Sequence, residues 1–108
     1  MAFKSVVTAD IGTSGSPSTI SPTVAAGQTA TLIGLSLANT SATSVTISAE
    51  LNKNGGGSAF LIKDATVLPG GALAIVGGDQ KVVLEESDTI TAYSSAATSV
   101  DVVVSYLI

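Results

Sequence analysis

Three short apolar segments separated by turns occupy residues 67–93, VLPGGALAIVGGDQKVVLEESDTITAY, and constrain the fold more than any other stretch. ALAIV, KVVLE and TITAY each have the length of a strand, and the connections between them leave no room for a helix. Pro69 presets φ for the first central position of a turn, and Gly70 can take the positive φ of the second. Gly77-Gly78 can form a tight connection between antiparallel strands, and Glu86-Ser87-Asp88 is too densely charged to be buried. We therefore expect antiparallel β structure.

The composition limits what such a chain can bind. The 108 residues form one domain, and only 11% are charged against 45% hydrophobic, so Ser, Thr, Gly, Asn and Ala must cover the surface. A surface with so little charge favours close packing against neighbours over the alternative, a small acidic monomer. Net charge is −4 with four lysines, which excludes a basic nucleic-acid face. No apolar run reaches the ~20 residues of a membrane span, and the N-terminus has no signal-peptide core, so we expect synthesis in the cytoplasm and no membrane partner.

Residues 1–28 are expected to form an N-terminal strand followed by a Gly/Ser/Pro-rich arm or loop. Apolar and polar residues alternate over residues 3–11, which predicts a half-buried strand. Its predicted inward face consists of Phe3, Val7, Ala9 and Ile11. Pro17 and Pro22 exclude a central strand in the segment 12–23. This segment is either an arm that lets the first strand pair with a neighbouring copy, or an ordinary long surface loop.

Residues 29–108 are expected to form the body of the domain. The segment 43–52 alternates most regularly, with Val45, Ile47, Ala49 and Leu51 inward and Ser44, Thr46, Ser48 and Glu50 outward. A strand over 30–39 should point Ile33, Leu35 and Leu37 inward. Leu32 on its other face, with Gly34 in mid-strand, indicates another layer or subunit close by. Residues 59–67 are apolar on both faces and predict a central strand, and 98–107 predict the last one.

Eight strands, a ninth candidate at 19–25 and no amphipathic helix predict an all-β fold. Polar turns every 10–14 residues are typical of a single antiparallel β-sandwich, either jelly-roll or immunoglobulin-like. The sequence does not choose between these two topologies.

The residues of ordinary catalysis are missing. Without His or Cys there is no Ser-His-Asp or Cys-His arrangement, and the adjacent Glu85 and Glu86 point to opposite faces of a strand. Asp79, Glu86 and Asp88 together are a weak Ca²⁺ candidate, since a solvated acidic turn explains them better. Asn54-Gly55 predicts a type I′ hairpin with Gly55 to Gly57 as its exposed tip. A strand rather than a helix follows these glycines, which disfavours a phosphate loop. We expect no catalytic, cofactor or metal site.

Several phrases of residues 29–108 resemble small structural proteins of tailed bacteriophage virions. They are TLIGLSLANTSATSVTISAEL, VLPGGALAIVGGDQKVVLEESDTITAYSS and SVDVVVSYLI. Gly34-Leu35, the Pro69-Gly70-Gly71 turn, Lys81 with Leu84, and Ser105-Tyr106-Leu107 occupy the corresponding places. Ser87 departs from the pattern, because a glycine is common before the aspartate there. The resemblance implies a role in the virion, on the capsid or in the neck, tail, baseplate or fibres.

The leading hypothesis is a non-enzymatic protein that decorates or cements the capsid. It would bind the major capsid protein and other copies of itself, preferably as a trimer, through apolar contacts and multivalency. The predicted contact residues are Phe3, Val6, Pro17, Ile20, Pro22 and Leu32. A neck, tail, baseplate or fibre component is the alternative within this class. A module that binds host-surface glycans is the alternative of another class, and the shortage of aromatic residues speaks against it.

Overall fold

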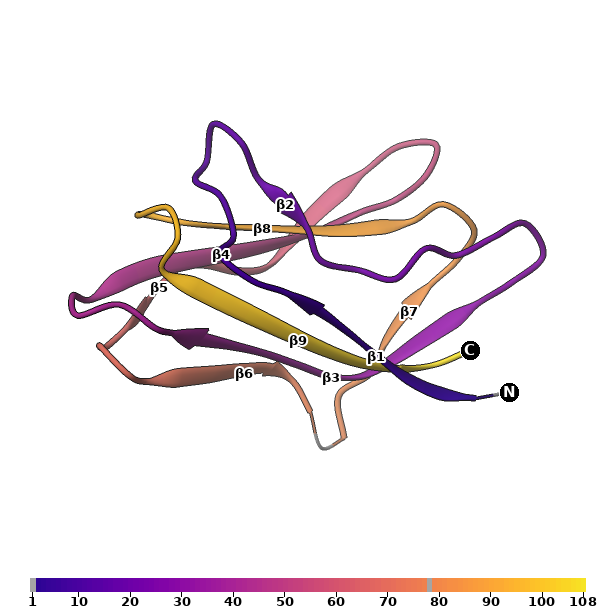
Figure 1. Cartoon of the computed structure of the whole chain (residues 1–108). Coiled ribbons are helices and arrows are strands. Elements are labelled where there is room, and N and C mark those ends of the chain that lie inside the picture. Colours follow the sequence, from indigo (N-terminus) through magenta and orange to yellow (C-terminus); the bar gives the residue numbers. More distant parts are fainter. Residues whose placement is uncertain (1, 78) are drawn as a thin grey trace.

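The computed structural model describes residues 2–77 and 79–108, and within them it contains nine strands in two antiparallel sheets and no helix (Figure 1). The expected all-β sandwich is confirmed. The strands are β1 (Phe3–Thr8), β2 (Ser18–Thr19), β3 (Ala30–Asn39), β4 (Val45–Asn52), β5 (Ser58–Val67), β6 (Ala72–Val76), β7 (Val82–Leu84), β8 (Thr89–Ser94) and β9 (Val100–Leu107). Within the described residues, no helix is long and apolar enough to cross a membrane.

The two sheets share the core between them. One sheet has five strands in the order β1-β9-β3-β6, with β7 also paired to β3, and the other has four in the order β2-β8-β4-β5. The chain ends lie side by side, because Ala2 and Ile108 exchange backbone hydrogen bonds of 2.6 and 3.0 Å. The facing sides of the sheets supply almost entirely aliphatic side chains to the core. In β4 and β9 these come from alternating positions, as expected for strands with one face buried.

Strand β3 departs from the expected alternation because it contains a bulge. Its register against β9 shifts between Leu32 and Gly34, so that Leu32, Leu35 and Leu37 all point into the core while Ile33 is only half-buried. The prediction that Leu32 faces away from the core was wrong. Gly34 lies in this irregularity beside the Ser105 side chain, which accounts for a glycine in mid-strand.

Strand β1 faces the opposite way from the prediction. Val6 and Thr8 lie toward the sandwich, while Phe3 and Val7 are 76% and 67% exposed. The alternation fails because Asp10, at φ +53°, interrupts the extended backbone before Ile11, whose N–H still bonds to Val100 O of β9. Ile11 is therefore fully buried, although it has the same parity in sequence as the exposed residues.

Strand β5 is an edge strand, not the central one that its apolar residues predicted. It pairs with β4 and lies at the end of its sheet, so one side of the strand is open. Lys63 and Asp64 are exposed on it, and Asp64 has a left-handed φ of +49°. Asp64 also covers the buried Ser48 of β4. The Asp64 N–H donates to the Ser48 hydroxyl at 2.9 Å, and this hydroxyl donates to Asp64 Oδ1 at 3.3 Å. Charge and irregular backbone protect this edge from pairing with other chains.

The turns follow their sequences in part. Gly70 has φ +72° and Gly71 N–H donates to Leu68 O at 2.9 Å, which confirms the turn predicted at Pro69-Gly70. The β4–β5 connection is a longer loop over residues 53–57 rather than a two-residue type I′ turn, because Asn54 does not adopt a positive φ. Of the Gly77-Gly78 connection, Gly78 lies outside the described residues. The strands on either side, β6 and β7, both pair with β3 and are not paired with each other.

The N-terminal segment is built into the sandwich of its own chain. β1 pairs with β9 over six residues, and β2 pairs with β8. Between and after them, Ile11 and Ile20 are buried in the core, and Pro22 is buried as well. Residues 12–23 are thus a surface connection with anchored apolar residues. β2 overlaps the ninth strand expected at 19–25 only at Thr19, and residues 20–25 form no strand, so that prediction was wrong beyond Thr19.

Candidate functional site

The outer side of the five-stranded sheet is a wide surface with little charge, and we call it the outer face. Opposed residues of antiparallel strands share a face, so the pairing registers define its members. They are Phe3, Ser5 and Val7 of β1, Thr31, Gly34, Ser36 and Ala38 of β3, Ala72 and Ala74 of β6, Val83 of β7, and Asp101, Val103, Ser105 and Leu107 of β9. One residue of this set, Asp101, is charged.

The outer face carries most of the large apolar side chains that the fold leaves in solvent. Phe3, Val7, Val83 and Val103 are 76%, 67%, 50% and 44% exposed. Val7 and Val103 are direct cross-strand neighbours. Exposed apolar residues gathered on one face, with small neutral residues between them, are typical of a surface that contacts another protein.

The six contact residues predicted from the sequence are not brought together. Phe3 lies on the outer face, Val6 is half-buried on the inner side of β1, and Pro17 is exposed in the loop before β2. Ile20, Pro22 and Leu32 are buried within the chain itself. Contacts between these three residues and another copy stay a prediction. They could form only if the N-terminal segment were exchanged between copies. Val103 and Val83 were missed, although their alternation with buried valine or leucine neighbours pointed to them.

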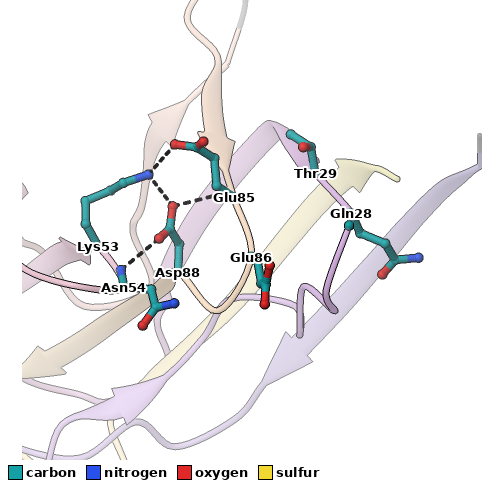
Figure 2. A pocket seen from close by; sticks show the side chains of 8 residues that line it. Gln28, Thr29, Lys53, Asn54, Glu85, Glu86 and Asp88 are labelled. Carbon is teal, nitrogen blue, oxygen red and sulfur yellow. Dashed lines mark hydrogen bonds and ion pairs between the residues drawn. The ribbon is translucent and has the colours of Figure 1, made fainter.

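A buried carboxylate organises the acidic turn between β7 and β8 (Figure 2). Asp88 is only 2% exposed, so the expectation that the whole Glu86-Ser87-Asp88 turn is solvated was wrong. Its Oδ1 accepts from Asn54 N–H at 2.9 Å, and its Oδ2 accepts from Glu85 N–H at 2.9 Å and from the Lys53 ammonium group. Lys53 also pairs with Glu85 at 2.8 Å. The cluster ties the β4–β5 loop to the β7–β8 turn.

The pocket beside this cluster, about 450 Å³, is lined by Gly27, Gln28, Thr29, Lys53, Asn54, Glu85, Glu86 and Asp88. The hydrogen bond from Lys53, with those from the two backbone N–H groups, lowers the pKa of Asp88 from 3.8 to about 2. The bond to Asp88 likewise raises the pKa of Lys53. Both groups stay ionised near neutral pH, so neither is suited to act as a general acid or base there. Glu86 points away from the pair in Figure 2, and in the described part of the chain no three acidic residues gather as a metal site.

Ser87 occupies the position where the resemblance expects glycine, and its backbone explains that preference. Its φ is +61°, a left-handed conformation that costs a non-glycine residue about 1 kcal/mol. We predict that Ser87→Gly raises the free energy of unfolding by about 0.5 kcal/mol, since glycine's larger unfolded-state entropy offsets part of the relief. Urea unfolding measures the difference. Ser44→Gly, at an exposed site without a positive φ, should be neutral or destabilising; an equal gain there would contradict this explanation.

A second pocket, about 270 Å³, lies against the outer side of the four-stranded sheet. It is lined by Thr13, Ser14, Thr46, Lys63, Asp64, Tyr93, Ser94 and Ser95. The Lys63 Nζ lies 5.0 Å from the ring centre of Phe60 and 5.8 Å from that of Tyr93, and it donates to the Tyr93 hydroxyl at 3.2 Å. This hydrogen bond raises the pKa of Lys63. Lys63 contacts Tyr93 at its hydroxyl edge, and Tyr93 is the one aromatic residue among those that line this pocket.

No protein-family model matches the chain, and no curated protein is similar enough to it to count as a relative.

Proposed function

We propose that the protein is a non-enzymatic structural component of a tailed-phage virion that attaches to the capsid through its outer face. The observation that carries this proposal is the gathering of Phe3, Val7, Val83 and Val103 on a face with a single charged residue, Asp101. Such a face loses little hydration free energy when it is covered, and apolar burial then stabilises the complex. The choice of the major capsid protein as the partner rests on the resemblance of residues 29–108 to small structural proteins of tailed-phage virions.

The neck, tail or baseplate remains the alternative location, since the same face would serve there. Labelling of purified virions with an antibody against the chain, viewed by electron microscopy, distinguishes the heads from the tails. The glycan-binding alternative rests on the second pocket, and the presence of one aromatic lining residue there, Tyr93, does not favour it. Binding of the protein to a glycan array would revive that alternative.

We predict that Val103→Asp abolishes sedimentation of the protein with purified heads of the encoding phage. The substitution puts a charge at an exposed point of the outer face, where a partner would have to desolvate it, and it removes no core contact. Thr66→Asp, at an exposed site on β5 of the other sheet, adds the same charge and should leave sedimentation unchanged.

Binding of the Val103→Asp protein at the wild-type level would refute attachment through the outer face. Absence of the chain from purified virions, judged by mass spectrometry, would refute the virion role itself.

A further inference from the structure

The free edge of β1 is the least protected edge of the sandwich. β5, the other long edge strand, carries exposed Lys63 and Asp64, a left-handed residue and shifts of register against β4. β2, β6 and β7 span two, five and three residues. β1 is continuous over six residues and pairs with β9 without a shift of register. An edge of this kind is a template for adding another strand.

The backbone groups that point to this edge follow from the hydrogen bonds at the chain ends. Ala2 and Ile108 exchange two backbone hydrogen bonds, and such pairs alternate along antiparallel strands. The N–H and C=O groups of Lys4, Val6 and Thr8 therefore face β9. Those of Phe3, Ser5 and Val7 face outward from the edge, and these same residues direct their side chains to the outer face.

The edge is complementary to itself. When two copies of β1 run antiparallel about a two-fold axis at Ser5, Phe3 of one copy lies opposite Val7 of the other, and the two Ser5 residues face each other. All three outward-facing backbone pairs are then satisfied, and each Phe3 gains a β-branched cross-strand partner on the outer face. Lys4, the single charged residue of β1, directs its side chain to the other face of the strand.

We propose that two copies of the chain pair through β1 in this register, so that their five-stranded sheets become one sheet of twice the width. The negative residues of each chain lie outside β1, which lets two chains of net charge −4 approach along this edge. The geometry gives a two-fold dimer in place of the trimer preferred from the sequence, because an isologous pair closes after two copies. The dimer presents two outer faces side by side, and it does not depend on the proposed virion role.

Ser5→Pro tests the pairing directly. The Ser5 N–H faces away from β9, so proline removes no hydrogen bond of the monomer, while its ring blocks the edge. We expect wild-type protein to show a monomer–dimer equilibrium in sedimentation equilibrium, and Ser5→Pro to raise the dimer dissociation constant by about tenfold or more. Ser5→Ala, which keeps the N–H, should dimerise like the wild type, and all three proteins should melt at similar temperatures.

A cysteine probe keeps the test valid if proline disturbs β1. The chain contains no cysteine, so Ser5→Cys introduces a single thiol. Opposed residues of a hydrogen-bonded antiparallel pair have Cα atoms ~5.5 Å apart, within the range of a disulfide. Ser5→Cys should therefore cross-link rapidly on oxidation, and Ser36→Cys, elsewhere on the outer face, should not.

Three results would overturn the proposal: wild-type protein that is monomeric at every concentration or trimeric, a Ser5→Pro protein that dimerises normally, and equal cross-linking of the two cysteine variants. A dimer that fails to bind phage heads would instead count against the proposed function alone.

Discussion

Asn39→Ala is expected to lower the free energy of unfolding by about 2–4 kcal/mol, because it leaves several polar groups without partners in and beside the core. Asn39 is 2% exposed at the end of β3. Its Nδ2 donates to Thr43 O at 2.8 Å and Val67 O at 3.1 Å, and its Oδ1 accepts from the Ser41 N–H at 2.9 Å and the Ser41 hydroxyl at 2.7 Å. One side chain thus joins β3 to the loop before β4 and to the end of β5.

Asn52→Ala is the matched control, and urea unfolding monitored by circular dichroism compares the two variants. Asn52 is half-buried, and its side chain bonds to the Thr91 hydroxyl, the Glu50 carbonyl and the Ser58 hydroxyl near the edge of the structure. Water can replace those partners, so we expect a loss below about 1 kcal/mol. A loss of that size or smaller for Asn39→Ala would show that the network around it contributes little to stability.

The sequence predicted correctly those features that depend only on residues close together in the chain. The alternation in β4 and β9 reflects the two-residue period of a strand, and the turn at Pro69-Gly70 follows from the φ values that those residues prefer. The all-β class followed from the spacing of such segments. No distant contact had to be known for these predictions.

The wrong predictions depended on irregular backbone or on strand order. The bulge at Ile33 and the left-handed Asp10 each change which parity of residues faces the core, and no composition rule reveals either. β5 has the apolar pattern of a central strand, but its position at the edge is set by how the sheet is assembled. Val6, Val7 and Ile11 show the result, since the parity of the buried residue changes within five positions.

The candidate surface was partly accessible from the sequence. Scarcity of charge predicted a protein that packs against others, and the low-charge outer face is consistent with that expectation without testing it. Its members come from strands distant in the sequence, such as β1, β7 and β9, so only the pairing registers bring them together. The burial of Asp88 was missed for the same reason, because its partner Lys53 lies 35 positions away.

The second large effect concerns Asp88 in acid. Its pKa is about 2 in the folded chain against 3.8 for an ordinary aspartate, so the folded state binds the proton more weakly than the unfolded state. The stabilisation from this carboxylate is therefore complete above pH ~4 and is lost as the pH falls from 4 to 2. We expect the wild-type melting temperature to fall through that window. Asp88→Asn should melt several degrees lower at pH 7 and lose the part of the acid dependence that Asp88 contributes.

The asparagine is a severe change despite its shape, because the Asp88 oxygens accept from Asn54 N–H, Glu85 N–H and the Lys53 ammonium group. An amide NH₂ in place of either oxygen sets a donor against a donor, and Lys53 loses the carboxylate that neutralises it. Glu86→Gln, in the same turn but exposed, should leave the melting temperature at pH 7 unchanged. Equal effects of the two substitutions would mean that net charge, not the buried cluster, sets stability. In that case the hydrogen bonds around Asp88 would not hold the β4–β5 loop against the β7–β8 turn.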